Sequence, residues 1–254
     1  TRRSSDLVVG AAVATVLGYV VSTIIALIQL FLTKQKVKPV FKNCLEPQMI
    51  KLIFSYGLPS FVMNALGAFT VNFANMFLVR YSDTAVAFFG AYFKVQQLIF
   101  MTVNGLIQGC LPIMRFNYRA KEYGRLKQAN KSGTIIATVM MIVGMLLVLI
   151  FPKEILFLFS ASEEMCAFGV PAMRIMSLGF VFSGFSAMIA TYEQATDSIM
   201  PGVVVQLLRQ GVLLVPVIWL LNSAVQMTGI WLAFSITEFV TFLVAVVFAK
   251  IKNH

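Results

Sequence analysis

The chain has 254 residues, of which 59% are apolar and 12% are charged, and its mean hydropathy is +0.86. Soluble domains carry about 25% charged residues, so these charges are too few to cover a water-facing surface. The net charge of +10 does not indicate nucleic-acid binding, because the basic residues sit in short gaps between apolar segments and no groove-reading motif accompanies them. The composition predicts an all-α integral membrane protein.

Seven apolar stretches long enough to cross a bilayer follow one another along the chain. They cover residues 8–32, 51–79, 85–114, 132–151, 168–192, 201–221 and 229–249. Pro39 and Pro47 prevent a continuous helix between the first two, and Pro201 suits the first turn of the sixth. The pattern therefore predicts a multi-pass protein.

The basic residues between these spans are sorted by side. The 33–51 linker, the 115–131 loop and the C-terminal tail are basic and share one side by parity, whereas the gaps at 80–84, 152–166 and 222–228 fall on the other. Short basic loops stay in the cytoplasm, so the first group and the C-terminus are predicted to be cytoplasmic in a plasma membrane. Only Arg2 and Arg3 are discordant, which a truncated end would explain. The expected partners of these charges are anionic lipid headgroups of the bilayer, and no nucleic acid.

Amide side chains share faces on two of the predicted helices. Asn64, Asn72 and Asn75 lie within about 80° of arc, while Gln97, Asn104 and Gln108 form a stripe about 40° wide. Two interpretations stay open: a wet cavity for substrate or cation binding, or hydrogen bonds between helices. Met101, beside the second stripe, and Tyr192, at the end of the fifth span, complete the binding candidates.

Four ionisable residues lie deeper in the spans, where charge is costly and tends to be functional. Lys94 and Arg174 sit about two turns from the outer side, Arg209 sits about two turns from the inner side, and Glu238 is near the middle of the last span. Glu238 is either a coupling or ligand-binding acid or one half of a structural ion pair with Arg174 or Lys94. The sequence slightly favours the structural pair.

Signatures of enzymes and metal sites are missing from the sequence. The single histidine is His254 at the chain end, and Cys44, Cys110 and Cys166 are far apart. No phosphate-cradling glycine loop and no zinc-protease motif is present. We therefore expect a transport protein that is not an enzyme and has no metal site.

Several short motifs occur in an order that resembles multidrug and toxic compound extrusion (MATE) transporters. Gly57-Leu58-Pro59, Phe89-Gly90, Asn104-Gly105-Leu106-Ile107-Gln108-Gly109, Pro112-Ile113 and Asn117-Tyr118 are similar to the family's seventh and eighth helices. The runs that resemble its tenth to twelfth helices are Arg174 to Phe180, Glu193-Gln194-Ala195 with Pro201, Leu208-Arg209-Gln210 and Gly229-Ile230-Trp231.

The resemblance implies a domain organisation. Residues 1–33 would be the sixth helix of an N-terminal lobe, residues 34–50 a basic cytoplasmic inter-lobe linker, and residues 51–254 the six-helix C-terminal transmembrane lobe. The N-terminal lobe of the same transporter would then be a missing partner.

The resemblance also implies a function. The whole protein would export small cationic, lipophilic compounds through a bacterial inner membrane, by alternating access and antiport. It would need no cofactor beyond Na⁺ or H⁺ as the coupling ion. The alternatives are a flippase for a lipid-linked saccharide or other lipid, and an inactive half-transporter.

The sequence departs from the family pattern at a few positions. Gly67 stands where some members have an acid in the seventh helix, Lys94 stands in place of an Arg, and Arg119 replaces a small residue. Coupling would therefore use acids of the N-terminal lobe or Glu238.

Overall fold

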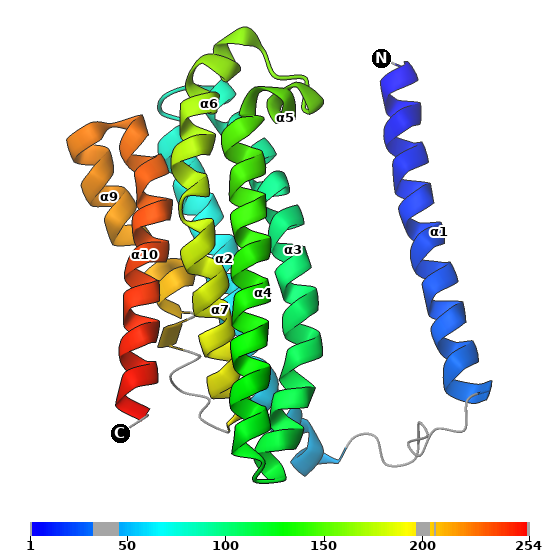
Figure 1. Ribbon diagram of the computed structural model, residues 1–254. Helices are drawn as coiled ribbons and strands as arrows, with labels where there is room; N and C mark the ends of the chain where they lie inside the picture. The colour runs from blue at the N-terminus through cyan, green and yellow to red at the C-terminus, as the bar shows by residue number, and fades with distance from the viewer. Residues whose placement is uncertain (1, 33–45, 197–203, 206, 253–254) are drawn as a thin grey trace. The chain divides into compact units, whose positions relative to one another are not determined.

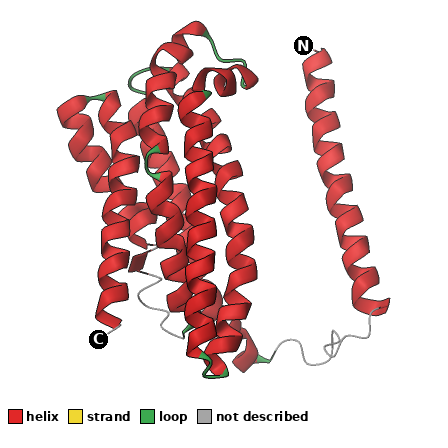
Figure 2. Cartoon of the chain, viewed as in Figure 1, coloured by secondary structure: helices red, strands yellow, loops and turns green. Residues whose placement is uncertain are grey.

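The computed structural model describes residues 2–32, 46–196, 204–205 and 207–252, and the structural statements below concern those residues. Their regular elements are all helices (Figure 2). The chain divides into two compact units, Thr1–Phe54 and Ser55–His254. The predicted 34–50 linker lies largely outside the described residues and stays a prediction, although its last residues already belong to a helix.

The first unit contains α1 (Arg2–Leu32), which includes an apolar stretch from Ala12 to Phe31 long enough to cross a membrane. Its large apolar side chains, such as Leu17 and Ile24, are exposed. A helix that is apolar on all sides suits a lipid environment. The next helix, α2 (Pro47–Leu78), carries the chain into the second unit.

The second unit is a bundle of helices (Figure 1). After α2 come α3 (Asp83–Arg119), α4 (Tyr123–Ile150), the short α5 (Pro152–Leu158), α6 (Glu163–Ser177), α7 (Phe180–Ala195), η1 (Leu208–Val212), α9 (Leu214–Val225) and α10 (Met227–Lys252). Helix α4 packs on α3 and α7, and α10 packs on α6, α7 and α9. The arrangement is that of a multi-pass helical membrane protein.

Capping residues fix where the helices on the predicted outer side begin. Ser82 and Ser162 accept hydrogen bonds from the N–H groups of Ala85 and Met165, three residues into α3 and α6, at 3.0 and 3.2 Å. Each satisfies a backbone donor that the first helical turn leaves unpaired. Pro152 begins α5, where its missing N–H costs nothing.

The prediction that residues 115–131 form a loop is wrong, because most of them are helical. Only Ala120–Glu122 separate α3 from α4, with Lys121 in the left-handed region at φ 60°. Arg115 and Arg119 belong to α3, while Arg125, Lys127 and Lys131 belong to α4. Hydropathy marks where a segment becomes polar, but a helix can continue past that point.

The predicted fifth span consists of two helices. Helix α6 ends at Ser177 and α7 begins at Phe180, and the N–H groups of Leu178 and Gly179 bond to the carbonyls three residues back, at 3.3 and 3.4 Å. The hydroxyl of Ser235 on α10 donates to the carbonyl of Ile175 at 2.6 Å. This bond ties α10 to the last turn of α6.

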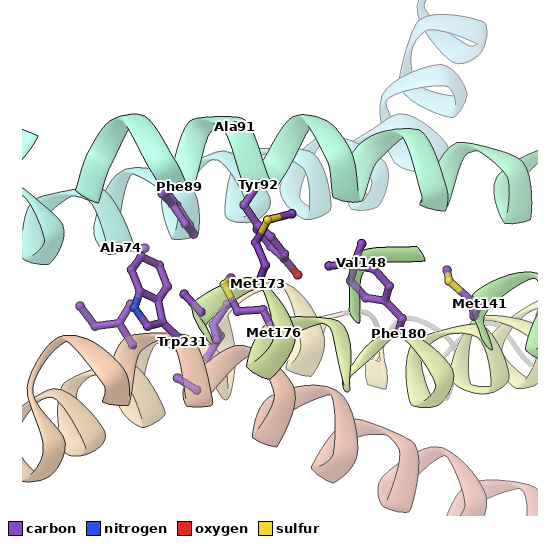
Figure 3. Packing of buried hydrophobic residues seen from close by; sticks show 14 of the residues in the cluster. Ala74, Phe89, Ala91, Tyr92, Met141, Val148, Met173, Met176, Phe180 and Trp231 are labelled. Carbon is purple, nitrogen blue, oxygen red and sulfur yellow. The ribbon is translucent and has the colours of Figure 1, made fainter. Parts of the chain in front are cut away.

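Aromatic and sulphur-containing side chains fill the core of the second unit. Phe88 and Trp231 meet edge to face, with ring centroids 5.2 Å apart. Figure 3 shows Tyr92 of α3 beside Met173, with Met176 close by on α6. These buried side chains hold α3, α6 and α10 around one centre.

Glycine and methionine make two reciprocal contacts between α4 and α7. A Cβ at Gly133 of α4 would lie 2.6 Å from the terminal methyl of Met188 on α7. Conversely, a Cβ at Gly184 of α7 would lie 2.8 Å from Cγ of Met141 on α4. Each helix therefore inserts a methionine into a gap left by a glycine of the other, which brings the two backbones close together.

Candidate functional site

An ion pair lies among the helices of the second unit. Nε of Arg209, on η1, donates to Oε1 of Glu238, on α10, at 2.8 Å. The two side chains are 19% and 14% exposed. The hypothesis that Glu238 pairs with Arg174 or Lys94 is therefore wrong as to the partner. Arg174 instead donates to the carbonyl of Leu149 at 3.3 Å, and within the described residues Lys94 is exposed and forms no ion pair.

The Arg209 guanidinium has a second neighbour besides the carboxylate. Its Cζ lies 4.9 Å from the ring centroid of Phe100, on α3, within the range of a cation–π contact. The other oxygen of Glu238, Oε2, is buried and accepts no hydrogen bond from the described residues. The carboxylate thus has one occupied and one unoccupied acceptor.

A cavity of about 540 Å³ contains this pair in its wall. Its lining combines aliphatic, aromatic, amide and charged groups from α2, α3, η1, α9 and α10: Gly67, Ala68, Thr70, Val71, Phe93, Gln96, Gln97, Phe100, Asn104, Arg209, Leu214, Phe234 and Glu238. Ligand sites usually enclose about 300–1,000 Å³ and combine apolar walls with a few polar groups. We call this set of residues the ion-pair cavity.

The local backbone explains how Arg209 reaches the cavity. Residues Leu208–Val212 form a π-helical turn, in which the N–H of Leu213 bonds to the carbonyl of Leu208 at 3.1 Å. Pro216 favours this irregularity, because it has no N–H for the carbonyl of Val212 and its ring crowds that group. Such turns replace regular helix at many functional sites.

Gly211 allows η1 to approach α2 closely. A Cβ there would lie 2.9 Å from both Leu66 Cγ and Thr70 Oγ1, closer than ordinary packing permits. Thr70 also lines the cavity and donates to the carbonyl of Leu66 at 2.9 Å. The glycine therefore sets the spacing between the cavity wall on α2 and the turn that carries Arg209.

Glu238 also packs against the break between α6 and α7. A Cβ at Gly179 would lie 3.2 Å from Cγ of Glu238 and 3.3 Å from Cα of Ser235. Together with the bond from Ser235 to Ile175, this contact leaves the Glu238 stem little room to shift. The acid is thus placed by this packing and by Arg209.

The predicted amide stripes meet the cavity only in part. Gln97 and Asn104 line it, whereas Gln108 and Met101 are exposed and do not. On α2, Asn72 is exposed and donates to Ala68 of its own helix at 2.9 Å.

Asn75 and Tyr192 are not among the described residues that line the cavity. Asn75 is half-buried, and its Oδ1 has no partner within the described residues. The side chain of Asn64 lies outside the described residues. Tyr192 is half-buried on α7 and packs against the core.

Several cavity residues were not predicted. Gln96 is adjacent in sequence to Gln97, so a polar face defined over a wider angle around the helix would have included it. Phe93, Phe100 and Phe234 gave no signal, because apolar aromatic residues are common throughout these spans. Their role depends on which neighbouring helix they face, and helical spacing within one segment does not reveal that.

Comparison with known proteins decides the family. Residues 59–220 match the MatE family model. The chain belongs to the MATE family. Curated relatives include the multidrug export protein MepA of Staphylococcus aureus, 26% identical over 233 residues, which cover 91% of this chain and 51% of that protein. MepA of Staphylococcus saprophyticus is 26% identical over 242 residues, 94% of this chain and 52% of that protein. The chain spans about half the length of the curated relatives it matches.

Solved MATE structures share the fold. An outward-facing multidrug resistance MATE family transporter of the MOP superfamily superposes with a TM-score of 0.82 at 19% identity, over 96% of this chain and 55% of that one. A MOP superfamily transporter from Pyrococcus furiosus gives a TM-score of 0.83 at 19% identity, over 96% and 56%. These likenesses confirm the predicted fold class, an integral membrane protein of MATE type.

Proposed function

We propose that this chain is about half of a transporter that exports cationic, lipophilic compounds in exchange for Na⁺ or H⁺. The observation that carries the proposal is the ion-pair cavity, which sets the carboxylate of Glu238 among aromatic and amide side chains. The names of the curated relatives, multidrug export proteins, support the export of drugs.

The cavity residues suit weak and varied recognition of organic cations. Phe93, Phe100 and Phe234 offer apolar faces and ring quadrupoles, which attract cations at about 0.5–2 kcal/mol each. Gln96 and Gln97 supply donors and acceptors on adjustable stems. Glu238 supplies the only acidic group in the described lining, so we attribute the preference for positively charged ligands to this residue.

Coupling would follow from competition for that carboxylate. A ligand shifts a conformational equilibrium only by its difference in affinity for the two states. If Na⁺ or H⁺ and the organic cation prefer opposite orientations of the transporter, each drives the release of the other. Alternating access then needs no covalent chemistry.

The proposal includes an orientation and a location. The transporter would lie in the inner membrane of a bacterium, with the turn between α3 and α4, the linker and the C-terminus in the cytoplasm. The other half of the transporter would be an N-terminal lobe that completes a central cavity.

Transport by the full-length protein, reconstituted into vesicles, tests coupled export. With an imposed Na⁺ or H⁺ gradient, we expect ethidium to accumulate against its own gradient and this accumulation to stop when an ionophore collapses the ion gradient. An unchanged rate after collapse of both gradients would contradict antiport. A flippase is less well supported, because Arg209 is the only basic residue in the described lining and Glu238 already neutralises it.

A second experiment tests the half-transporter assignment. Cells that lack other efflux pumps would produce residues 1–254 alone or together with an N-terminal MATE lobe. We expect ethidium export only from the combination. Export by residues 1–254 alone would show that this chain is sufficient.

A further inference from the structure

The Arg209 side chain has the chemical features of the ligand that the ion-pair cavity is proposed to bind. Its guanidinium is flat, carries a delocalised positive charge and bears N–H donors. It sits between an aromatic face, Phe100 at 4.9 Å, and a carboxylate oxygen of Glu238 at 2.8 Å. A flat organic cation with amino or amidinium groups would use the same two partners.

We propose that Arg209 is a built-in competitor, which occupies the site of the ligand's planar cationic group, and that such a ligand binds by displacing it. The inference rests on the proposed function in taking organic cations as ligands. It adds a preference within that class: flat, delocalised cations with N–H donors over bulky cations without them.

The contact between Arg209 and Glu238 is suited to exchange. It joins one nitrogen, Nε, to one oxygen, Oε1, in contrast to the two parallel bonds of the stronger bidentate geometry. Oε2 has no hydrogen-bond partner within the described residues, although it is buried. A ligand with two N–H donors would satisfy both oxygens, so displacement exchanges one hydrogen bond for two.

The backbone beneath Arg209 is also suited to rearrangement. The residue lies on the π-turn Leu208–Val212, in which Gly211 departs from helical geometry, with φ 178° and ψ −34°. In this turn the bond from the N–H of Leu213 to the carbonyl of Leu208 replaces the regular i to i−4 pattern. The adjoining cavity of about 540 Å³ gives the long side chain space to withdraw into.

Arg209 also stabilises the ion-pair cavity when no ligand is bound. A buried carboxylate without a partner is costly, so Glu238 needs a counter-charge when no ligand is present. Arg209 provides this counter-charge. Because a ligand binds only when the pair is open, the apparent affinity equals the intrinsic affinity multiplied by the fraction of molecules in which the pair is open. Weak binding favours release of the exported compound.

Ligand binding to the purified protein of full natural length, in detergent and without any ion gradient, tests the inference. The probes are proflavine, a flat amino-substituted cation, followed by fluorescence anisotropy, and tetraphenylphosphonium, a bulky cation without N–H groups. The variants are Arg209→Gln, Glu238→Gln and the double variant. Lys94→Gln is the matched control, because Lys94 is an exposed cation on α3 outside the cavity lining.

Arg209→Gln should bind proflavine about tenfold more tightly, which corresponds to a pair that is closed in about nine molecules of ten. Tetraphenylphosphonium affinity should change less than proflavine affinity. The gain should disappear when Glu238→Gln is added, and Lys94→Gln should bind as the wild type does. Unchanged or weaker proflavine binding by folded Arg209→Gln would overturn the inference.

Arg209→Lys covers the case in which Arg209→Gln does not fold. It keeps the positive charge but loses the flat fork, so it should compete less well and bind proflavine about threefold more tightly. Equal or weaker binding by this variant also contradicts displacement. Because binding is measured without a gradient, tighter binding by an Arg209 variant together with no coupled export by the wild-type protein would leave the inference standing while the proposed antiport fails.

Discussion

Two sets of charged side chains in this chain have different surroundings. Four basic residues lie at helix ends and are exposed: Arg115, Arg119, Arg125 and Lys127. In the proposed orientation they are the cytoplasmic charges of the positive-inside pattern. Arg209 and Glu238 face each other in a cavity and are mostly buried. Only the second group is positioned to discriminate among ligands.

Glu238→Gln should weaken coupling more than folding. The amide keeps the size of the carboxyl group and its packing on Gly179, but it removes the charge for which an organic cation and the coupling ion compete. Gradient-driven export should fall at least about tenfold, the loss expected when about 1.4 kcal/mol of charge recognition disappears. Glu164→Gln, at an exposed position in the first turn of α6, is the control and should export normally. A large loss of membrane-inserted Glu238→Gln protein would favour a structural role instead.

Gly179→Ala should destabilise the protein by about 1–2 kcal/mol, because the new methyl group would crowd Glu238 and the α10 backbone at 3.2–3.3 Å. Gly105→Ala is the matched control. Its Cβ would meet nothing within 4 Å, and alanine is the better helix former by about 1 kcal/mol, so it should be neutral or stabilising. Thermal unfolding in detergent measures both, and equal effects at the two positions would contradict the close approach at Gly179.

The sequence selected several residues that line the cavity, but the ion pair that it predicted was wrong. Glu238, Arg209, Gln97 and Asn104 were selected from depth and helical spacing, and all four line the cavity. The partner of Glu238 was wrong because depth was counted along straight, ideal helices. The π-turn at Leu208–Val212, which carries Arg209, departs from that ideal geometry.

Two irregular regions among the described residues contact the ion pair. The α6–α7 break lies against Glu238, and η1 carries Arg209. Hydropathy did not reveal the break because Leu178 and the residues after it remain apolar, so the fifth span looked continuous. Residues in such irregular turns can change their φ and ψ more readily than residues within a full hydrogen-bond ladder.

Ser235→Ala should loosen the joint between α10 and α6. The variant removes the 2.6 Å bond to the carbonyl of Ile175, which is worth about 0.5–1 kcal/mol. Hydrogen exchange at Leu178 and Gly179 should become faster. Ser223→Ala is the control, because Ser223 bonds within its own helix, to Leu220 at 2.7 Å, and should leave exchange at the break unchanged.

For the whole molecule, the order of apolar segments predicted the membrane class, whereas the MATE fold was predicted from the resemblance of short motifs to that family. The membrane class depends on average composition over about 20 residues, which the sequence states directly. The exact ends of the helices depend on caps and tertiary packing, so the predicted 115–131 loop became two helix ends around Ala120–Glu122.

The proposed orientation makes a labelling prediction. In a background without Cys44, Cys110 and Cys166, Arg125→Cys should be protected from a membrane-impermeant maleimide in intact cells, whereas Glu154→Cys should react. Both positions are exposed, so a difference in reactivity reports the side of the membrane. Permeabilised cells, in which both should react, provide the control. The opposite pattern would invert the topology.

The two methionine–glycine contacts between α4 and α7 make the helix packing sensitive to methionine oxidation. Met141 and Met188 are fully buried, each in a gap that only glycine leaves open. Oxidation of either thioether to a sulphoxide would place a polar oxygen in a space too small to hold it. Damage at these contacts would therefore force α4 and α7 apart, while the ion-pair cavity itself stays chemically unmodified.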